Sequence, residues 1–462
     1  MRHAIIDLGS NAIRASVYEK NTLGSVILFN QKFKSDTASL LSKDSFDVKH
    51  GIYTIFDYFS KIFDNLNVTK VTCVATEILR AHERSFLFVE EVYKRFGIKI
   101  DILTGNEEAK LSALGVISSL SEADGISVDL GGGSLEIAEI KDKKVIKVES
   151  IRRQSLPDNS ERSGDNITRY ISNAFANKKY QTLYLIGGTF RLLGLLYIDY
   201  TESKIKNLHN LTISVGDFLY FLEKAYLDLK NLKSLKFLSI TLKSIQDTTA
   251  VVNFFSPDSI VISTYGLKEG VRFVNLPIEE QDKDLVIERC KELDQTSSVV
   301  NLNSYLQLVE SIGIELPLCQ RRLFFAALFL TRATKMIDQN FGFDYLCNFM
   351  LNTDIPFSHS ERAILISIFL SSHNGYNQKT YKFINVILSK KELALGQILG
   401  AIIKITFLVE GGLISSPSFS IVKKEHYLEI VHKNIMPKIL FDKICQQLKI
   451  LSSSIRTYGS SK

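Results

Sequence analysis

DLGGGS (Asp129–Ser134) repeats, about 120 residues later, the pattern DLGS (Asp7–Ser10) near the start of the chain. Each stretch follows a short apolar run typical of a β-strand and leads directly into another such run. The repetition predicts two related lobes, each with a glycine turn between two strands. We expect the two turns to face each other across a cleft, where they would hold one polyphosphate from both sides.

The sequence from Ala4 to about Val271 alternates β-branched runs with helical patterns, which predicts an α/β fold of mixed sheets covered by helices. After Pro277 the chain becomes charged and poor in strands, and apolar residues recur at helical spacing. We therefore predict a first lobe over residues 1–122, a second lobe over residues 123–277 and a mostly helical domain over residues 278–462. The predicted strands are Ala4–Leu8, Ile13–Tyr18, Lys70–Ala75, Ile98–Leu103, Gly125–Leu130, Leu135–Ile140, Val145–Ile151 and Thr182–Ile186.

Composition excludes several classes of protein. The net charge of +6 is mild for 462 residues and no run of Lys or Arg is present, so we expect no nucleic-acid partner. Asp7 follows only three apolar residues, which are too few for a secretory signal, so we expect a cytoplasmic protein. The apolar stretch Leu395–Leu413 carries Gln397, Lys404 and Glu410, which favours a buried helix over stable membrane insertion. The five cysteines are scattered without a C-x-x-C pair, which argues against a disulfide framework and a zinc site.

The glycine turns suit a phosphate ligand. Glycine at a strand-to-strand turn allows positive φ and exposes backbone N–H groups that bind anions. Asp7 and Asp129 end the strands before the two turns, so their carboxylates suit Mg²⁺. A third glycine site, Gly187-Gly188-Thr189, leaves a strand and opens a helix whose first N–H groups suit a further phosphate. The alternatives are plain tight hairpins at the first two sites and close packing at the third.

Glu107 and Glu108 lie in the first turn of a helix predicted to begin after Thr104, where the helix dipole favours their ionised form. An ionised carboxylate that points into the predicted cleft could orient and deprotonate an attacking water as a general base. Acidic first turns are common, so a purely structural role is the alternative.

Glu136 and Arg80 complete the charged candidates. Glu136 lies two residues after Ser134 on the same strand face, so it would add an acidic group beside the turn. Arg80 follows a buried-looking strand and could offer a forked donor to phosphate oxygens, with an ordinary surface arginine as the alternative.

The order of these motifs resembles that of the exopolyphosphatase and guanosine pentaphosphate phosphohydrolase family from Ala4 to about Phe273. The resemblance implies two actin-like, ribonuclease-H-like lobes with Mg²⁺ and substrate phosphates between them, and a helical C-terminal domain similar to a degenerate HD domain. It rests on IDLGSNAIR (Ile6–Arg14), ATEILRA (Ala75–Ala81), TGNEEAKLSALGV (Thr104–Val116), SVDLGGGSLEI (Ser127–Ile137), IGGTFRLL (Ile186–Leu193) and TYGLKEGV (Thr264–Val271).

The resemblance also implies roles for single residues. Glu108 would be the catalytic base, Arg80 would clamp phosphate, and Asp129 and Glu136, with Asp7, would hold the metal or its waters. Whether K⁺ or another monovalent ion is also needed stays open. The implied substrate contacts are Asp7, Gly9, Ser10, Asn11 and Arg14 in the first turn, Gly131, Gly132, Gly133 and Ser134 in the second, and Gly187, Gly188 and Thr189 in the third.

The chain departs from the family pattern at several positions. Leu135 stands where the family commonly has Thr, and Asp158-Asn159 stand where it usually continues Leu-Gly. Glu77 adds a negative charge near Arg80. An HD-type metal site needs a His-Asp pair, and the sequence contains no such dipeptide, so we expect no second active site and only packing or surface roles for His359 and His373.

Hydrolysis of terminal phosphates from inorganic polyphosphate is the first functional hypothesis, because no motif indicates guanine recognition. Guanosine pentaphosphate remains open as a further or alternative substrate. An actin-like kinase or ATPase shares paired Asp-Gly turns but would need an adenosine pocket, and Leu135 with Asp158-Asn159 leaves room for a non-catalytic sensor of guanosine polyphosphates. We expect a homodimer, with the helical domain extending the substrate groove or forming the dimer contact.

Overall fold

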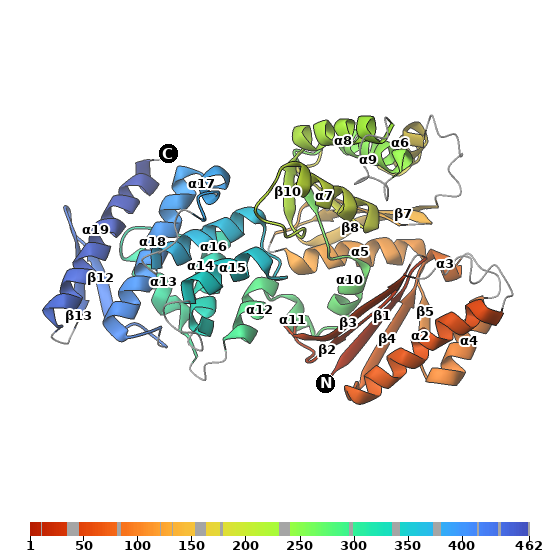
Figure 1. Cartoon of the computed structure of the whole chain (residues 1–462), viewed down its shortest axis with the longest axis horizontal. Helices are drawn as coiled ribbons and strands as arrows, with labels where there is room; N and C mark the ends of the chain where they lie inside the picture. The colour runs from red at the N-terminus through yellow and green to blue at the C-terminus, as the bar shows by residue number, and fades with distance from the viewer. Residues whose placement is uncertain are drawn as a thin grey trace. The chain divides into compact units, whose positions relative to one another are not determined.

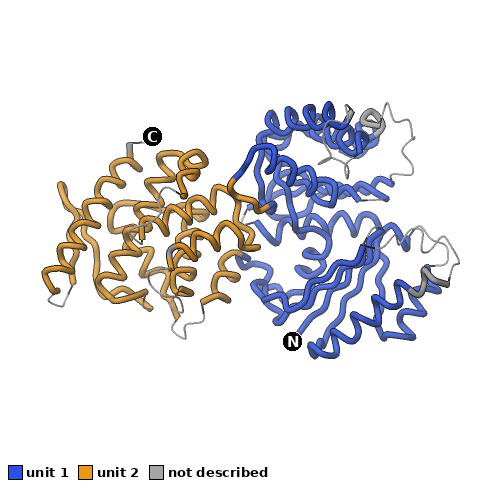
Figure 2. The backbone as a smooth tube through the Cα atoms, in the orientation of Figure 1, with its two compact units in different colours: residues 1–203, 208–285 blue, residues 204–207, 286–462 orange. Residues whose placement is uncertain are grey.

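A computed structural model of the chain divides it into two compact units (Figure 2). The first unit contains residues 1–203 and 208–285, and the second contains residues 204–207 and 286–462. The start of the helical domain was predicted at residue 278. The residues described are 1–10, 12–34, 46–80, 85–120, 122–131, 133–152, 163–175, 179–230, 241–294, 299–334, 342–372, 380–413, 415–432 and 436–460.

The first sheet of the first unit has the strand order β3-β2-β1-β4-β5. Strands β1 (His3–Leu8), β2 (Ala12–Tyr18) and β3 (Ile27–Lys34) form an antiparallel meander, and β4 (Lys70–Ala75) and β5 (Ile100–Ile102) run parallel to β1 on its other side. Helices α2 (Phe46–Asn65) and α4 (Ser85–Phe96) cover one face and share its apolar core (Figure 1). The short helix α3 (Glu77–Arg80) begins just after β4 ends.

The second sheet repeats this topology. Its order is β10-β11-β9-β6-β7-β8, in which β6, β7 and β8 form an antiparallel meander and β9 and β11 run parallel to β6. The strands are β6 (Gly125–Leu130), β7 (Ser134–Lys141), β8 (Lys144–Arg152), β9 (Thr182–Ile186), β10 (Leu211–Ser214) and β11 (Ser259–Ile262). The covering helices are α6 (Ser163–Ala174), α7 (Gly188–Tyr200), α8 (Val215–Lys230) and α9 (Leu242–Phe255).

Matching strand orders confirm the prediction of two related lobes. The strands β1 to β5 of the first sheet correspond in order and direction to β6, β7, β8, β9 and β11 of the second. This is the ribonuclease-H-like topology of actin-like lobes, and a mostly helical region follows it, so the predicted fold class is confirmed.

Two helices cross between the lobes. Helix α5 (Gly105–Ser119) follows β5 of the first sheet but packs on β6, β7 and β8, whereas α10 (Leu267–Val274) follows β11 of the second sheet but contacts β1. The two helices approach closely at glycines: a Cβ on Gly115 would lie 2.1 Å from the carbonyl oxygen of Gly266. Any side chain at Gly115 would therefore push the helices apart.

Most predicted strands of the two lobes are present within one or two residues of their predicted bounds, and three are exact: Lys70–Ala75, Gly125–Leu130 and Thr182–Ile186. The prediction missed β3, β10 and β11 and the hairpin β12 (Phe419–Lys423) with β13 (Leu428–His432). Strand β3 is an exposed edge strand, so its sequence ILFNQKFK carries too little apolar alternation to identify it.

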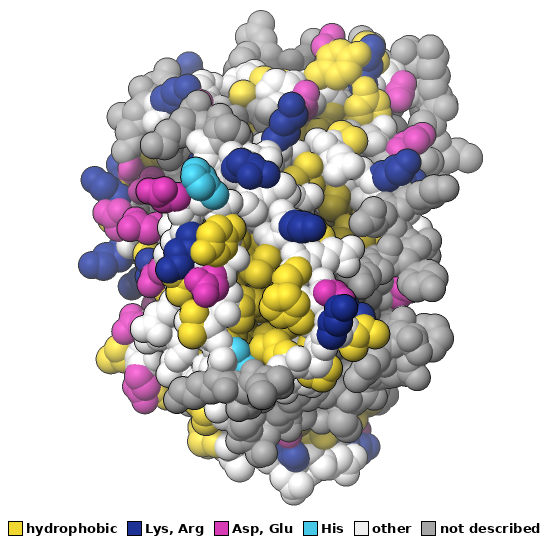
Figure 3. Space-filling view, turned by 90° about the vertical axis from the view of Figure 1, so that its left-hand side faces the viewer, with side chains coloured by type: hydrophobic (Ala, Val, Ile, Leu, Met, Phe, Trp, Pro, Cys, Tyr) yellow, Lys and Arg dark blue, Asp and Glu magenta, His cyan; other side chains and the backbone are white. Residues whose placement is uncertain are grey.

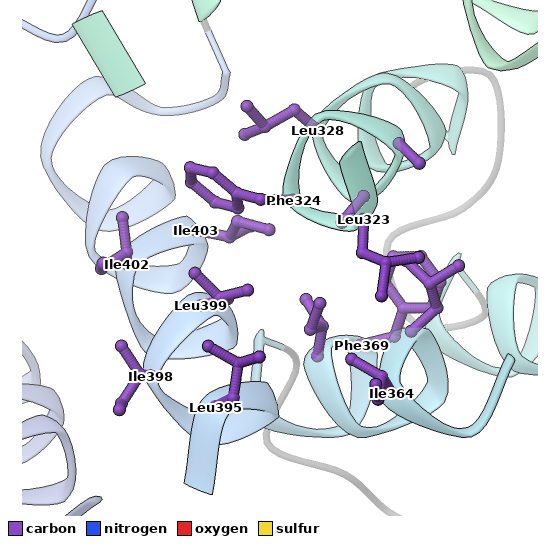
Figure 4. Close-up of a cluster of buried hydrophobic side chains, with 14 of the residues drawn as sticks. Leu323, Phe324, Leu328, Ile364, Phe369, Leu395, Ile398, Leu399, Ile402 and Ile403 are labelled. Carbon is purple, nitrogen blue, oxygen red and sulfur yellow. The ribbon is translucent and has the colours of Figure 1, made fainter. Parts of the chain in front are cut away.

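The second unit is helical around one apolar core. Helices α14, α16 and α18 supply the labelled side chains of that core, including Phe324, Phe369 and Leu399 (Figure 4). Helix α11 (Ile278–Gln281) still belongs to the first unit, and the helices that follow it are α12 (Leu285–Leu293), α13 (Leu302–Glu310), α14 (Leu318–Ala333), α15 (Gly342–Asn352), α16 (His359–Ser372), α17 (Ile384–Ile387), α18 (Lys390–Glu410) and α19 (Lys438–Ser460).

Polar side chains in this unit serve packing. The fully buried Arg362 donates to the carbonyl oxygens of Met350 and Ile355 at 2.6 and 2.8 Å. His359 Nε2 lies 2.6 Å from the carbonyl oxygen of Asn207. These contacts satisfy buried groups within the unit. His373 lies outside the described residues.

Helix α18 is long and apolar enough to cross a membrane by length and composition alone. Its apolar side chains are mostly buried against neighbouring helices of the second unit, as in the core helix of a globular domain.

At the end of the unit that carries α19 and the β12–β13 hairpin, Figure 3 shows hydrophobic side chains gathered among charged ones. Exposed apolar residues of these elements include Val431, Ile439 and Phe441.

Candidate active site

The first hairpin brings Asp7 and Arg14 together. They are cross-strand partners on β1 and β2, and Arg14 Nη1 lies 3.6 Å from Asp7 Oδ2. The turn is closed by the Gly9 N–H, which donates to the carbonyl oxygen of Ala12 at 3.0 Å. Ser10 lies in the turn, and Asn11 is outside the described residues.

The second hairpin repeats this geometry with an acidic pair. Asp129 and Glu136 are cross-strand partners, and the Gly131 N–H donates to the carbonyl oxygen of Ser134 at 3.0 Å. Two serines orient the carboxylates: Ser112 Oγ donates to Asp129 Oδ2 at 3.0 Å, and Ser150 Oγ donates to Glu136 Oε1 at 3.2 Å. Gly132 lies outside the described residues.

The start of α5 gives its two glutamates different roles. Thr104 caps the helix, and its N–H and side chain both bind Glu107 in a capping box, which lowers the pKa of Glu107. Because Glu107 is committed to the cap, Glu108 one residue later is free to turn inward, where its side chain is 13% exposed. The predicted helix start is confirmed, and only one of its glutamates is directed towards the hairpins.

Arg80 holds Glu108 in place. Its Nη2 lies 3.2 Å from Glu108 Oε2 and 2.9 Å from Glu77 Oε2, while its Nε donates to the same Glu77 oxygen at 3.0 Å. A third contact runs from Nη1 to the carbonyl oxygen of Leu103. The guanidinium is therefore oriented on three sides before any ligand binds.

Burial and mutual repulsion act on the carboxylates of the two hairpins. Burial raises the pKa of Glu108 to about 7; Arg80 opposes this shift, and the charge of Asp129 adds to it. Burial also raises the pKa of Glu136 well above its usual range, with Glu108 and Asp129 as further causes. Burial likewise raises the pKa of Asp7 and of Asp129. The same groups influence one another across the two sheets, so the structure brings Asp7, Asp129, Glu136 and Glu108 into one electrostatic site.

The third glycine site contacts the second hairpin directly. Gly187 has φ of 101°, and a Cβ there would lie 2.6 Å from Asp129 Oδ1, so only glycine fits. Gly188 and Thr189 open helix α7, as predicted. Gly133 is similarly confined, because its Cβ would lie 2.9 Å from Cγ of Glu77. Glycine is needed at these two positions because neighbouring residues approach the backbone closely, and not only because glycine allows unusual backbone angles.

Two cations of the site were not among the predicted residues. Arg191 lies one turn into α7, where its Nε donates to the carbonyl oxygen of Gly187 at 3.0 Å. Burial lowers the pKa of Arg191, and the negative charges of Asp129 and Asp7 act in the opposite direction. Lys32 is the cross-strand partner of Arg14 on β3, and its pKa is lowered by burial and by Arg14 and Arg191. Arg191 could have been predicted as a site residue from its place in the motif IGGTFRLL. Lys32 could be predicted only once β3 is recognised as a strand that pairs with β2.

Strand register gives the two lobes complementary rows of side chains. In the first sheet, neighbouring strands align Asp7, Arg14 and Lys32. At the corresponding positions the second sheet aligns Asp129, Glu136 and Ser150. Cross-strand partners share one face of a sheet, so one lobe presents a mainly basic row and the other a mainly acidic row.

The acidic row is suited to a divalent cation that shares its ligands with a substrate. Among the described residues, no group of three or more His, Cys, Asp and Glu side chains converges as a complete metal site. Mg²⁺ is commonly bound by one or two carboxylates with water and phosphate oxygens completing the shell. Asp129 and Glu136 fit this arrangement, since adjacent buried carboxylates with raised pKa values would be relieved by a cation.

Several known proteins are similar to this chain in sequence. A guanosine-5'-triphosphate,3'-diphosphate pyrophosphatase of Pseudoalteromonas translucida is 22% identical over 410 residues, 82% of each chain. Retrograde regulation protein 2 of Saccharomyces cerevisiae is 27% identical over 167 residues, 33% of this chain and 28% of the relative. Exopolyphosphatase 1 of Mycobacterium tuberculosis is 27% identical over 154 residues, 31% of this chain and 44% of the relative. The chain thus matches less than half the length of the latter two.

Solved structures show the same fold. A Ppx/GppA family member of Aquifex aeolicus matches with a TM-score of 0.50 and 22% identity, over 59% of this chain and 96% of that one. An exopolyphosphatase of Cytophaga hutchinsonii matches with a TM-score of 0.51 and 21% identity, over 59% and 97%. Residues 24–279, more than half of the chain, match the Ppx/GppA phosphatase family, so the chain belongs to that family.

Proposed function

We propose that this protein is a Mg²⁺-dependent phosphoanhydride hydrolase that releases terminal phosphate from inorganic polyphosphate. One observation carries the proposal: Glu108 lies at a helix start, Arg80 holds it in place, and burial together with the charges of Asp129 and Asp7 raises its pKa to about 7. A general base is most effective when its pKa is near the working pH. Family membership supports the reaction class.

In the proposed reaction, Glu108 accepts a proton from a water whose oxygen attacks the terminal phosphorus. The bond from that phosphorus to the bridging oxygen breaks, orthophosphate forms, and the shortened chain leaves with the bridging oxygen. Arg80 is within reach to bind a phosphate oxygen, because its Nη2 already lies beside Glu108. Gly133 of the second turn would supply its backbone N–H group to the same phosphate, since the Gly131 N–H already donates to the carbonyl oxygen of Ser134.

Asp129 and Glu136 would hold Mg²⁺ together with phosphate oxygens, and Asp7 would act through a bound water. When bound there, the ion would neutralise phosphate charge. Ser112 and Ser150 keep the two carboxylates oriented whether or not a ligand is present, since each donates to one of them.

The basic row favours a substrate with several phosphates in a row. Arg14 and Lys32 are adjacent across strands, and Arg191 is close enough to affect the pKa of Lys32. A single phosphate at Glu108 would not need these cations, whereas a chain of phosphates that continues across the first hairpin would be neutralised by them.

Guanosine pentaphosphate is the second candidate substrate. The relative named for cleavage of that compound covers 82% of both chains, including residues beyond the two lobes. Its hydrolysis would use the same base and the same hairpins, so the two reactions are alternatives for one site. A cytoplasmic location and a homodimer stay predictions.

A substrate panel tests the proposal. Phosphate release is measured with Mg²⁺ from long-chain polyphosphate, tripolyphosphate, guanosine pentaphosphate and ATP. Release from polyphosphate is expected to be fastest. Release only from guanosine pentaphosphate would support the second candidate. Phosphate transfer from ATP to an acceptor, or ligand binding without turnover of any compound, would contradict a hydrolase and indicate the kinase or sensor alternative.

A further inference from the structure

Arg152 ends strand β8 beside the second glycine turn. It is the cross-strand partner of Ser134, the residue that follows the three glycines. Its side chain is 58% exposed, and its Nε lies 3.5 Å from Glu77 Oε1. An exposed guanidinium beside the turn that is proposed to bind phosphate is placed to meet a ligand.

Glu77 joins Arg152 to Arg80. One oxygen of the Glu77 carboxylate accepts from Arg80 at 3.0 Å, and the other faces Arg152. The stem of Glu77 packs against Gly133 of the turn, where a Cβ would lie 2.9 Å from Glu77 Cγ. The Glu77 side chain is 10% exposed, so its position is fixed by packing as well as by charge.

We propose that Glu77 is a positioning residue that pairs Arg80 with Arg152, and that Arg152 binds the second phosphoryl group of a linear polyphosphate. The contacts follow the order Glu108, Arg80, Glu77, Arg152. Arg80 is thus beside the reacting end of the substrate. Arg152 is further from that end, on the other side of the Glu77 carboxylate. This assignment rests on the proposed function, because it takes the terminal phosphate to lie at Glu108.

The charges explain why Glu77 is needed. Two guanidinium groups next to one turn repel each other, and a shared carboxylate offsets that repulsion while restraining both side chains. Without Glu77, Arg80 would keep its contacts to Glu108 and Leu103, but Arg152 would lose its contact to the Glu77 carboxylate. The Arg152 side chain would then be solvated and free to adopt more conformations. It would lose more conformational entropy on binding, which would weaken its contact with a ligand.

Binding of two probes tests the assignment. Calorimetry compares tripolyphosphate with orthophosphate, all variants being made in a Glu108→Gln background to limit turnover. Arg152→Gln is expected to weaken tripolyphosphate binding about tenfold, the usual loss for one charge-assisted hydrogen bond, and orthophosphate binding less than twofold. Lys144→Gln removes the same charge from the opposite end of β8 and is expected to leave both affinities unchanged. Equal weakening of both probes by Arg152→Gln would overturn the assignment.

A double-mutant cycle tests the role of Glu77. Glu77→Gln is expected to weaken tripolyphosphate binding as Arg152→Gln does, and the double variant to be little weaker than either one. Independent, multiplying effects would contradict the positioning role. In the otherwise wild-type enzyme, Arg152→Gln should raise KM for polyphosphate while changing kcat less than twofold, whereas Glu77→Gln, which also removes two contacts of Arg80, should raise KM and lower kcat. If the wild type hydrolyses no phosphoanhydride but the binding cycle gives the expected pattern, the proposed function fails while the pairing of Glu77 with Arg152 stands.

Discussion

Arg80 Nη2 lies 3.2 Å from Glu108 Oε2, which joins the residue proposed to bind phosphate to the residue proposed to activate water. The contact stabilises the carboxylate form of Glu108 against the burial that raises its pKa. A phosphate that binds Arg80 would compete with Glu108 for the same guanidinium. Binding of substrate and basicity of the carboxylate are therefore coupled through one side chain.

Replacing Arg80 should move the acidic limb of the pH–rate profile to higher pH. Arg80 lowers the pKa of Glu108, so Arg80→Gln removes that effect and raises the pKa above about 7. More of the base is then protonated at neutral pH. The measurement is kcat/KM for polyphosphate between pH 5.5 and 9, with the exposed Arg95→Gln as control. An acidic limb that stays in place, or moves to lower pH, would contradict the coupling.

Glu108 should cost stability at neutral pH. Its pKa rises from 4.5 to about 7 on folding, so the native state binds the proton more tightly than the unfolded state. The contribution of the protonated Glu108 to the free energy of unfolding is fully present below about pH 4.5. It is lost as pH rises through about 7. Glu108→Gln should therefore raise the free energy of unfolding by up to about 3 kcal/mol at pH 8.5 and by little at pH 4.5.

The neighbouring Glu107 provides a control of opposite sign. Its hydrogen bonds to Thr104 lower its pKa, so its contribution is present above the unfolded pKa and is lost as pH falls. Glu107→Gln should reduce stability at pH 8.5, and the difference should shrink in acid. Urea titrations of both variants at the two pH values measure this. If both variants changed the free energy of unfolding in the same direction with pH, the pKa values of Glu107 and Glu108 would not be shifted in opposite directions, which would contradict this account.

Mg²⁺ should stabilise the folded protein even without substrate, since it would relieve the repulsion of Asp129 and Glu136. The melting temperature of the wild type is expected to rise with millimolar Mg²⁺. Asp129→Asn should abolish most of the rise, whereas the exposed Asp124→Asn should leave it intact. An equal rise in both variants would place the ion elsewhere.

Gly187 should be intolerant of any side chain. Gly187→Ala combines a φ of 101° with a Cβ 2.6 Å from Asp129 Oδ1, so we expect a loss of about 2 kcal/mol or more of stability and a large loss of activity. Gly188→Ala, where a Cβ would meet nothing within 4 Å, is the matched control for folding and should change the stability little. Thermal unfolding and phosphate release measure the two effects, and similar behaviour of the variants would contradict the confinement at Gly187.

The two lobes could be predicted from sequence because their signals are local. DLGS and DLGGGS each mark a turn between strands that are apolar on both faces, and the capping pattern at Thr104 fixes where α5 begins. The predicted residues Asp7, Glu108, Asp129 and Glu136 lie in one electrostatic site in the structure.

The remaining site residues depend on contacts that sequence spacing does not contain. Lys32 is aligned with Arg14 only through the register of β3, an edge strand with weak apolar alternation. Arg152 reaches Glu77 from a strand that lies 75 residues further along the chain. The pKa of Glu108 arises from burial and from charges on both sheets, which only the assembled fold supplies. Asn11 and Gly132, which were predicted to contact substrate, and Asp158-Asn159, which depart from the family pattern, lie outside the described residues.

Phosphate release from long-chain polyphosphate, with Mg²⁺ at pH 8, by the wild type and by Glu108→Gln tests the central claim most directly. The account predicts steady release by the wild type and a rate lower by about a hundredfold or more in the variant, with the fold and polyphosphate binding retained. Equal rates for the two proteins would contradict Glu108 as the base that activates water.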